Sequence, residues 1–249
     1  MNAVPRESAG VSVAPLVSVV TVCFNSARTI ERTLKSVINQ DYPNLEYIII
    51  DGGSTDGTLT TIDLYRDRIT HVISEPDGGV YDAMNKGVRR ATGDWVHILN
   101  SDDYYASRAA LQTAVPLLDR RRTNYFQMWR QFEDGRRDLQ DWTYRRWRLF
   151  VSAFLPHPGL IVSRDQYESV GLYDTRYRIA ADHEMILRLT AKWPGLKHDL
   201  PLTVMQQGGY SEMNLIQALR EFEAVTIRHG LPRPVAGLIY QLKRRWWRV

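Results

Sequence analysis

The chain of 249 residues contains a single cysteine, Cys23. One cysteine excludes a disulfide within the chain and a metal cluster built from several cysteines, and it fits a reducing compartment. No apolar run approaches the roughly 18 residues that a membrane-spanning helix needs. Residues 1–10 also lack the apolar core of a signal peptide. We therefore expect a cytoplasmic protein, with the inner face of the cytoplasmic membrane as a further candidate location.

The formal net charge is only +4, from 32 Lys and Arg against 28 Asp and Glu. So small an excess argues against a nucleic-acid-binding module, and we expect no nucleic-acid partner. The distribution is uneven, because basic residues gather at 120–122, 136–137, 145–148 and 243–248. Such groups favour anionic partners such as phosphates and acidic lipids, and a solvated basic face explains the middle groups equally well.

Short apolar segments alternate with amphipathic ones over the first hundred residues. Expected strands cover 17–24, 45–50, 70–74 and 95–99, and expected helices cover 28–40, a segment ending near 66, and 81–91. Strand–helix alternation with short connections predicts βαβ units and a parallel sheet. Right-handed crossovers then place the carboxyl ends of these strands at one edge of the sheet.

The pattern becomes more aromatic and basic after residue 118. Expected strands cover 125–132, 160–162 and 197–206, and expected helices cover 107–118, 165–170, 181–192, 213–229 and 234–247. We therefore predict an α/β fold with a mostly parallel, Rossmann-related sheet that is flanked by helices and followed by C-terminal helices. The expected division is a flexible leader at 1–15, a domain at 16–210 with halves at 16–105 and 106–210, and a helical appendage at 211–249.

Polar loops follow four of the expected strands, at 24–25, 51–56, 77–79 and 100–103. Because the carboxyl ends of these strands meet at one edge, the loops are expected to converge there. That edge is where open α/β sheets bind their ligands. The loop at 51–56 is rich in residues that turn, cap helices and bind through backbone N–H groups.

Asp102 and Asp103 come directly after the apolar strand expected at 95–99. Two adjacent carboxylates repel each other unless a cation or hydrogen-bond donors hold them. Hard oxygen ligands in a pair suit Mg²⁺ or Mn²⁺ that carries a substrate phosphate. The alternative is that both residues only cap the following helix, and the pair by itself leaves both roles open.

Several segments carry a resemblance to a known family. VSVVTVCFN, YIIIDGGSTDGT and EPDGGVYDAMNKGVRRATGDWVHILNSDD occur in this order within 16–105, and HPGLIVSRDQYESVGLYDTRYRIAADHEMILRL follows at 157–189. In order and spacing they resemble family 2 glycosyltransferases. The resemblance implies a GT-A fold, inverting transfer from a UDP- or GDP-linked sugar, and a Mg²⁺ or Mn²⁺ cofactor. It assigns nucleotide binding to 16–105 and the acceptor to 106–210.

The resemblance also implies roles for single residues. Phe24 falls where the family has an aromatic that stacks on the base. Asp103 falls on the metal-ligand position with Asp102 beside it, and Asp182 falls on the catalytic base. The implied donor-binding residues are Phe24, Asn25, Asp51, Gly53, Ser54, Asp77, Asn85, Lys86 and Asp102. His157 and Glu184 are further candidates, and for His157, which lies between two prolines, a structured turn is the alternative.

This sequence departs from the family pattern at four positions. Gly52 replaces the second acid before Gly-Ser, which leaves the contact to the base open. Met84 replaces an arginine, whose charge Lys86 is a candidate to supply. Ala181 replaces an acid that often precedes the catalytic Asp, and Asn100 replaces an acid three places before the metal ligand.

The chemistry of sugar transfer requires carboxylates in two separate roles. A divalent cation stabilises the charge that develops on a nucleoside diphosphate leaving group. The attacking hydroxyl is a poor nucleophile at neutral pH, so one carboxylate must accept its proton. Asp182, at the start of an expected helix, is the candidate base. A plain acid that is stabilised by the helix dipole is the alternative.

We therefore expect an inverting, metal-dependent glycosyltransferase that acts on a glycan or polyprenyl-pyrophosphate-linked acceptor in bacterial surface polysaccharide synthesis. A nucleotide-sugar hydrolase or a nucleotidyltransferase on the same fold is the alternative. The basic and aromatic tail from Lys243 to Arg248 is typical of a peripheral membrane anchor. A helix end whose cations favour the dipole explains this tail equally well.

Overall fold

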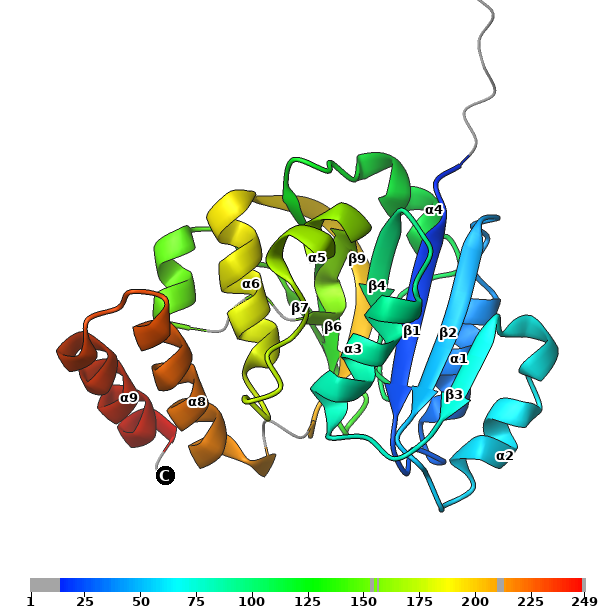
Figure 1. Ribbon diagram of the computed structural model, residues 1–249, viewed down its shortest axis with the longest axis horizontal. Helices are drawn as coiled ribbons and strands as arrows, with labels where there is room; N and C mark the ends of the chain where they lie inside the picture. Colours follow the sequence, from blue (N-terminus) through cyan, green and yellow to red (C-terminus); the bar gives the residue numbers. More distant parts are fainter. Residues whose placement is uncertain (1–13, 153–154, 156, 210–212, 248–249) are drawn as a thin grey trace, which may run out of the picture.

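The described residues form one mixed sheet of nine strands with helices on both faces (Figure 1). The structure, a computed structural model, describes residues 14–152, 155, 157–209 and 213–247. The strands are β1 Val17–Cys23, β2 Leu45–Asp51, β3 His71–Ser74, β4 Trp95–Ile98, β5 Tyr104–Tyr105, β6 Thr123–Gln131, β7 Arg137–Gln140, β8 Leu160–Ser163 and β9 Gly195–Gln206. The α-helices are α1 Ile30–Ile38, α2 Thr58–Asp63, α3 Val80–Arg90, α4 Ala110–Ala114, α5 Arg164–Val170, α6 Ala181–Lys192, α8 Leu215–Arg228 and α9 Arg233–Trp247.

The first half of the sheet is parallel, as the alternation of strands and helices predicts. The order across the sheet is β3-β2-β1-β4-β8-β6-β9-β5, and β7 pairs with β6 outside this path. β1 pairs in parallel with β2 on one side and with β4 on the other. Both β1 and β4 are buried along their whole length, which fits strands that are covered on both faces. Cys23 lies opposite Asp51, so the loops after β1 and β2 begin side by side.

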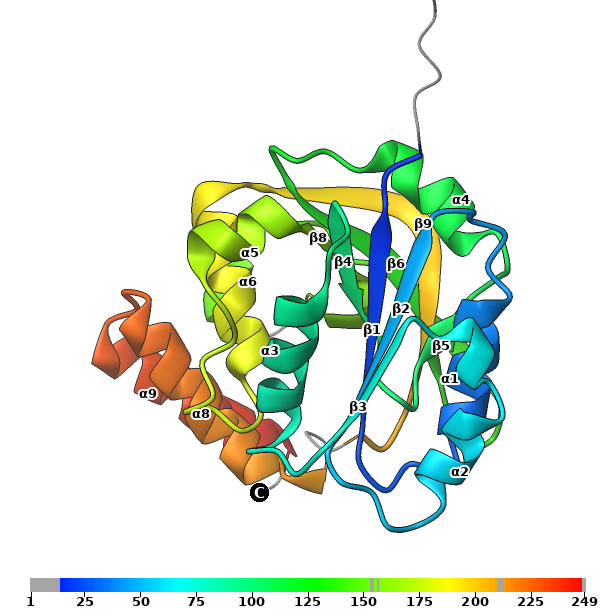
Figure 2. The same cartoon turned by 45° about the vertical axis from the view of Figure 1, so that its right-hand side comes forward.

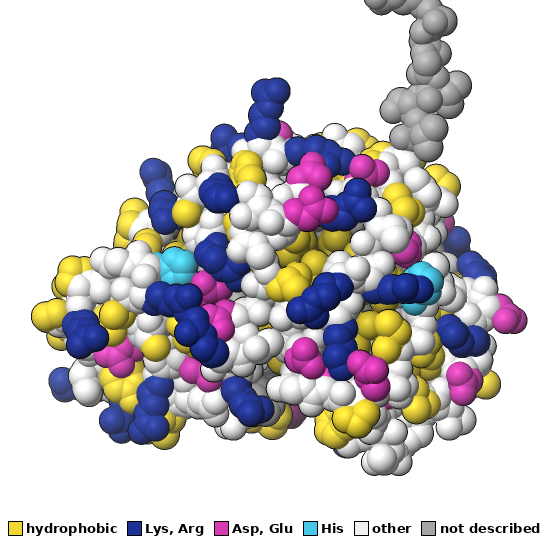
Figure 3. All heavy atoms as spheres, in the orientation of Figure 1, with side chains coloured by type: hydrophobic (Ala, Val, Ile, Leu, Met, Phe, Trp, Pro, Cys, Tyr) yellow, Lys and Arg dark blue, Asp and Glu magenta, His cyan; other side chains and the backbone are white. Residues whose placement is uncertain are grey.

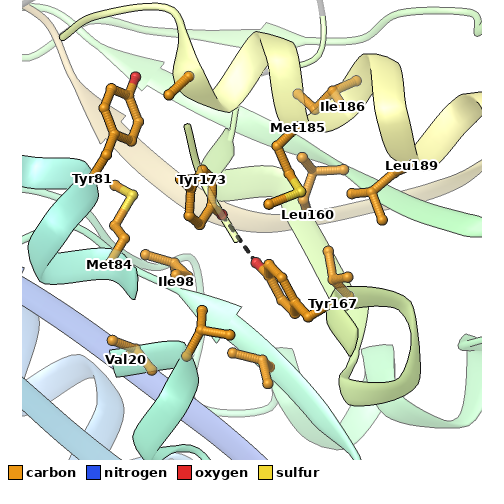
Figure 4. Close-up of a cluster of buried hydrophobic side chains, with 14 of the residues drawn as sticks. Val20, Tyr81, Met84, Ile98, Leu160, Tyr167, Tyr173, Met185, Ile186 and Leu189 are labelled. Atoms are coloured by element: carbon orange, nitrogen blue, oxygen red, sulfur yellow. Dashed lines mark hydrogen bonds between the residues drawn. The ribbon is translucent and has the colours of Figure 1, made fainter. Parts of the chain in front are cut away.

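Side chains of the central strands alternate between two apolar cores, one on each face of the sheet. Val20 and Ile50 belong to the core under α3 and α6, whereas Val19 and Ile49 belong to the core under α1 and α4. Figure 2 shows these helices on the two faces, and Figure 4 shows the core that α3 and α6 share. Since α3 and α6 both begin at the end of the molecule where β1 and β2 finish (Figure 1), the starts of the two helices border one edge.

The second half of the sheet mixes strand directions. β8 is antiparallel to both β4 and β6, whereas β9 runs parallel to β6. Two short strands were not expected from the sequence: β5 pairs with β9, and β7 pairs with β6. β5 begins directly after Asp103, while α4 begins only at Ala110. Asp102 and Asp103 therefore lie in a turn between two strands, and the alternative that they cap the next helix is wrong.

The helix expected at 107–118 is shorter in the structure. α4 ends at Ala114, and a 3-10 turn follows at Val115–Leu117. Pro116 has no N–H to donate, so the α-helical ladder cannot continue through it. The helix expected at 181–192 is observed as α6 with the same ends. Residues 1–13 of the expected leader and Arg248 of the expected anchor lie outside the described residues.

The last two helices pack against each other, and α8 also packs on α6 (Figure 1). The ring of Phe222 on α8 stacks on His183 of α6, with centroids 4.8 Å apart. Arg228, at the end of α8, lies 2.9 Å from the carboxylate of Asp174. These contacts fix α8 against the start of α6. Among the described helices, none has the length and apolar composition to cross a bilayer.

Candidate active site

Hydrogen bonds join the loops that follow β1 and β2. The backbone N–H of Asn25 donates to Ser54 Oγ at 2.8 Å, and the N–H of Thr55 donates to Asn25 Oδ1 at 2.9 Å. Asn25 has a φ of 49°, in the left-handed region that Asn tolerates better than most residues. This turn leaves the Phe24 side chain 61% exposed at the edge of the sheet, where its ring is free to stack on a ligand.

A second set of hydrogen bonds attaches the loop after β4. Ser26 Oγ lies 2.8 Å from Ser101 Oγ. Thr33 Oγ1 on α1 lies 2.9 Å from the carbonyl of Ser101 and 2.7 Å from that of Asp103. The loops after β1, β2 and β4 therefore meet at one edge, as the sequence pattern predicts.

Asp51 is fully buried at the end of β2. Its Oδ2 accepts hydrogen bonds from the N–H groups of Gly53 and Ser54, at 3.1 and 3.0 Å, and from the hydroxyl of Ser74 at 2.7 Å. Burial raises the pKa of this carboxyl, but the hydrogen bonds from Ser54, Ser74 and Gly53 outweigh burial and hold the pKa below its ordinary value. Because the carboxylate oxygens of Asp51 accept hydrogen bonds from the loop, this geometry favours a role for Asp51 in fixing the loop conformation.

Phe24, Gly52 and Asp77 lie against one another at the same edge. A Cβ at position 52 would lie 2.5 Å from Asp77 Oδ2 and 3.4 Å from the ring of Phe24. Asp77 is held in place by the N–H of Gly79, which donates to its Oδ1 at 2.8 Å. The Asp77 carboxylate thus fills the space of a side chain at 52, and a second acid there would meet a like charge. This explains why glycine stands where the family has an acid.

Lys86 and Asn85 on α3 have different partners. Lys86 Nζ lies 2.8 Å from Glu75 Oε1 and 3.2 Å from the carbonyl of Pro76, so its charge lies beside the loop after β3. Asn85 is buried. Its amide exchanges hydrogen bonds with the backbone N–H and carbonyl of Tyr173, at 2.8 and 2.9 Å. Asn85 therefore holds the segment that leads to α6, and its contacts do not reach the loops after β1 and β2.

The acidic pair after β4 is held in surroundings that disfavour charge. Asp103 is only 2% exposed and Asp102 is half-buried. Burial, and next the charge of Asp102, raise the pKa of Asp103 well above its ordinary value, and burial also raises the pKa of Asp102. Arg32 on α1 offsets these effects only in part. Its Nη2 donates to the carbonyl of Asp102 at 3.0 Å and to Gln206 Oε1 at 3.2 Å.

The oxygen atoms around this pair fit a divalent cation. Asn100 Oδ1 is buried and accepts no hydrogen bond from any described residue, while its Nδ2 lies 3.5 Å from Asp103 Oδ2. Two carboxylates and an unpaired amide oxygen are hard ligands of the kind that Mg²⁺ and Mn²⁺ prefer. Within the described ranges, no cluster of three or more His, Cys, Asp or Glu could hold a metal alone. A cation here would therefore need further oxygen ligands, such as phosphates or water.

Asp182 lies half-buried near the start of α6, where Tyr81 reaches it from the start of α3. The Tyr81 hydroxyl lies 3.1 Å from Asp182 Oδ1 and 2.5 Å from the carbonyl of Ile179, and the N–H of His183 donates to the same Oδ1 at 2.7 Å. Burial raises the pKa of Asp182, and these two donors lower it only in part. Tyr81 follows the loop at 77–79 directly, so Asp182 borders the same edge as the loops described above.

Glu221 on α8 is a neighbour of this group that the sequence did not indicate. Its Oε2 accepts hydrogen bonds from the N–H groups of Ile179 and Ala180, at 2.7 and 3.0 Å. Ala180 is the N-cap residue of α6 and has no polar side chain to cap the helix. A carboxylate of the C-terminal helices therefore caps the helix that carries Asp182. No local signal identifies Glu221, because the contact is 42 residues away from it along the chain.

His157 and Glu184 both take part in packing. His157 Nε2 lies 2.7 Å from the hydroxyl of Tyr173, and burial, the larger cause, lowers the pKa of His157 to about 3. Its ring is therefore neutral near pH 7. Glu184 forms an ion pair with Arg188 at 2.7 Å and a hydrogen bond with His229 Nε2 at 3.2 Å. These contacts hold helices together, and none of them points to a ligand.

Two solved structures show which fold this is. TarS 1–349 of S. aureus in complex with UDP-GlcNAc matches with a TM-score of 0.66 at 18% identity, over 90% of this chain and 70% of that chain. The mannosyltransferase PcManGT from Pyrobaculum calidifontis, in complex with GDP-Man and Mn²⁺, also gives 0.66, at 21% identity over 94% and 70%. This chain spans 42% of a longer TarS chain. The fold is that of the GT-A glycosyltransferases.

Sequence comparison identifies the family. The PGL/p-HBAD biosynthesis glycosyltransferase of Mycobacterium bovis is 27% identical over 256 residues, which cover 95% of this chain and 93% of the relative. TuaG of Bacillus subtilis, a putative teichuronic acid biosynthesis glycosyltransferase, is 44% identical over 92 residues, or 36% of each chain. Residues 18–176 match the model of Glycosyl transferase family 2. The chain belongs to this family, which confirms the resemblance seen in its motifs.

Proposed function

We propose that this protein transfers a sugar, with inversion, from a nucleotide-diphosphate donor to a hydroxyl of a glycan or lipid-linked glycan. The observation that carries the proposal is the meeting of two carboxylate sites at one edge of the sheet. One is the buried Asp103 with the half-buried Asp102, and the other is Asp182, which the hydroxyl of Tyr81 contacts. The first suits a divalent cation that neutralises the leaving diphosphate, and the second suits an acceptor hydroxyl.

The donor nucleotide would bind along the loops after β1, β2 and β3. The exposed ring of Phe24 offers a face for the base. Asp77, in the space left by Gly52, is the candidate to accept a hydrogen bond from the base or ribose, and Lys86 adds positive charge beside it. Uracil and guanine are both candidate bases, because TarS is seen with UDP-GlcNAc and PcManGT with GDP-Man.

The acidic loop would hold the cation. Asp103 is the proposed ligand, with Asp102 and the amide oxygen of Asn100 beside it. A bound Mg²⁺ or Mn²⁺ ion would act as a Lewis acid that neutralises the leaving diphosphate, and the presence of Mn²⁺ in PcManGT supports this assignment. Arg32 donates hydrogen bonds to the backbone of Asp102 and to the side chain of Gln206. These bonds hold the loop after β4 against the end of β9.

Asp182 is the proposed general base. Its pKa is raised by burial, which brings the carboxylate closer to the basicity that proton removal near neutral pH requires. Tyr81 and the N–H of His183 fix the orientation of Oδ1, and Glu221 holds the first turn of the helix. A hydroxyl activated at Asp182 would attack in line with the leaving diphosphate, and in-line attack inverts the anomeric centre.

The setting we propose is polysaccharide or glycolipid assembly at the bacterial cell surface. Relatives named for PGL/p-HBAD and teichuronic acid biosynthesis support this setting. We assign the donor to residues 16–105 and the acceptor to residues 106–210, with residues 211–249 as a helical appendage.

A thermal-shift panel of UDP, GDP and ADP, with and without Mn²⁺, tests the donor site. A ligand at 100 times its Kd stabilises the folded state by about 2.7 kcal/mol, so one base should raise the Tm clearly, and more so with Mn²⁺. A panel in which no nucleoside diphosphate raises the Tm would contradict the proposal. Release of free sugar from the donor at one rate with or without acceptor would instead identify a hydrolase.

A further inference from the structure

The terminal helix α9 exposes a row of apolar side chains. Val235, Leu238, Leu242 and Trp246 recur at intervals of three and four residues, which places them on one face of the helix. Their side chains are 44%, 60%, 58% and 82% exposed. Single apolar residues on a surface need no explanation, but a continuous row of large ones marks an interaction site.

A second face of α9, about a quarter turn from the apolar row, packs inside the molecule. Ala236 is buried, and Lys243 Nζ lies 3.5 Å from the ring centre of Phe222 on α8. Burial lowers the pKa of Lys243 to about 8. Lys243, the first residue of the expected tail, thus helps to attach α9 to α8. The outward apolar surface of α9 is the row from Val235 to Trp246, and it includes Trp246 of that tail.

Arg245 borders this row, and acidic residues are missing from the helix. Residues 231–249 contain five Lys and Arg, and no Asp or Glu occurs among them. At 100° per residue, Arg245 lies next to the apolar row, whereas Arg233 and Arg244 lie on the opposite face of the helix. Figure 3 shows yellow and dark-blue side chains next to one another at the end of the molecule formed by α8 and α9. Apolar residues with Trp on one face and Arg on the other are typical of helices that lie in a membrane interface.

The row lies at the end of the molecule that carries the candidate active site. α9 finishes, and α8 begins, at the same end as the loops after β1 and β3 (Figure 1). Met213 and Ile216, at the start of α8, are 72% and 44% exposed and add apolar surface there. A flat partner that contacts α9 at this end would lie close to the start of α6, which carries Asp182.

We propose that α9 docks this protein on an anionic lipid bilayer, with Leu238, Leu242 and Trp246 in the interface and Arg245 among the lipid phosphates. Docking would bring a lipid-linked acceptor to Asp182, and only this last step rests on the proposed function. A second copy of the chain is a poorer occupant, because residues 231–249 carry only positive charges, so a twofold contact between α9 helices would set two surfaces of like charge against each other.

Co-sedimentation of the full chain with vesicles, in the absence of donor and acceptor, tests the docking. We expect binding to vesicles that contain phosphatidylglycerol, and affinity lower by about tenfold or more for phosphatidylcholine alone. The double variant Leu238→Glu/Leu242→Glu should lose about tenfold or more in affinity for the anionic vesicles. The matched variant Leu64→Glu, at a leucine that is 75% exposed at the end of α2, should bind like the unaltered protein.

The opposing results are equally definite. Failure of the unaltered protein to bind anionic vesicles, or equal binding by the double variant, would overturn the docking proposal. So would a dimer in sedimentation velocity that the double variant converts to a monomer. Nucleotide-induced thermal shifts of the double variant separate this proposal from the donor site, because α9 contributes no residue to that site. A variant that responds to nucleotide like the unaltered protein but does not bind vesicles supports docking.

Discussion

Carboxylates at two strand ends on the same edge of the sheet differ in pKa because different groups surround them. Asp51 receives hydrogen bonds from backbone N–H groups and hydroxyls, which hold its pKa below the ordinary value despite burial. Asp103 is equally hidden from solvent, but the charge of Asp102 adds to the effect of burial and its pKa is well above the ordinary value. The same residue type is therefore held in its ionised form at position 51 and is disfavoured in that form at position 103.

The first prediction at this scale concerns Asp103→Asn. This change removes a charge whose burial is unfavourable when no cation is bound, so the free energy of unfolding of the metal-free protein should rise by about 1–3 kcal/mol near neutral pH. Sugar transfer should fall by about 100-fold or more. Urea denaturation and transfer assays measure the two effects. Asp67→Asn, at an exposed position, should change neither. A destabilised but active Asp103→Asn protein would contradict the assignment.

The second prediction concerns the pH dependence of transfer. Since the base must be ionised, kcat should rise as pH increases through the raised pKa of Asp182. Asp182→Asn should lower kcat by about 10²–10⁴-fold while the nucleotide-induced rise in Tm is kept. Tyr81→Phe removes a donor to the ionised carboxylate, so the acidic limb of the profile should move to higher pH. An unchanged limb in Tyr81→Phe would remove Tyr81 from the mechanism.

The third prediction tests whether Asp77 stands in for the acid that position 52 lacks. Gly52→Ala and Gly52→Asp place a Cβ against the Asp77 carboxylate, so both should weaken the nucleotide-induced rise in Tm. Adding Asp77→Gly to each relieves the clash. The pair Gly52→Asp/Asp77→Gly should recover nucleotide binding because it restores an acid, whereas Gly52→Ala/Asp77→Gly should not. Equal recovery by both pairs would show that only space matters at this position.

At the scale of elements, α8 supports α6 through Glu221. Glu221→Gln weakens the cap on the first turn of α6, and loss of a cap destabilises a protein by about 0.5–2 kcal/mol. The charge of Glu221 also raises the pKa of Asp182, so the acidic limb of kcat should move to lower pH. Glu223→Gln, two residues further along α8, is the matched control. Lower stability with an unmoved pH profile would limit Glu221 to a structural role.

The parallel half of the sheet could be predicted because each of its elements carries its own evidence. β1 and β2 are rich in Val and Ile, and α1 has the apolar residues Ile30, Leu34 and Val37 at helical spacing. β5 could not be predicted, since it consists of two residues that pair with Val204 and Thr203 far along the chain. β7 has mostly exposed side chains and no apolar alternation, so only its pairing with β6 defines it.

The candidate site could be predicted in its positions but not in its contacts. Sequence order places Asp51 and Asp103 at strand ends, yet the number of N–H groups around each carboxylate depends on the loop conformation. Asn85 belongs to a recognisable motif, but its pairing with Tyr173 appears only in three dimensions. Glu221 and Arg32 lie on amphipathic helices among other charged residues, and packing alone selects them.

At the scale of the whole molecule, two sets of carboxylates give stability opposite dependences on pH. Hydrogen bonds and charge from Arg176 lower the pKa of Asp174 to about 2, and Glu184 has a lowered pKa despite burial because His229 and Arg188 bind it. Such groups contribute stability above their unfolded pKa, and it is lost as pH falls through the folded pKa. The carboxylates with raised pKa values act in the reverse sense; they are Asp102, Asp103 and Asp182.

The last prediction follows from this opposition. Without metal and donor, the free energy of unfolding should be greatest at mildly acidic pH, above the ordinary carboxyl pKa of about 4, and should decline as pH rises through the raised pKa values of the site. Mn²⁺ with the preferred nucleoside diphosphate should remove most of the decline, because a cation favours the ionised forms of Asp102 and Asp103. Asp102→Asn/Asp103→Asn should lack most of the decline and the response to Mn²⁺. Urea unfolding across pH measures all three curves. A metal-free protein whose free energy of unfolding rises steadily into alkaline pH would show that ionisation of these carboxylates does not destabilise the fold.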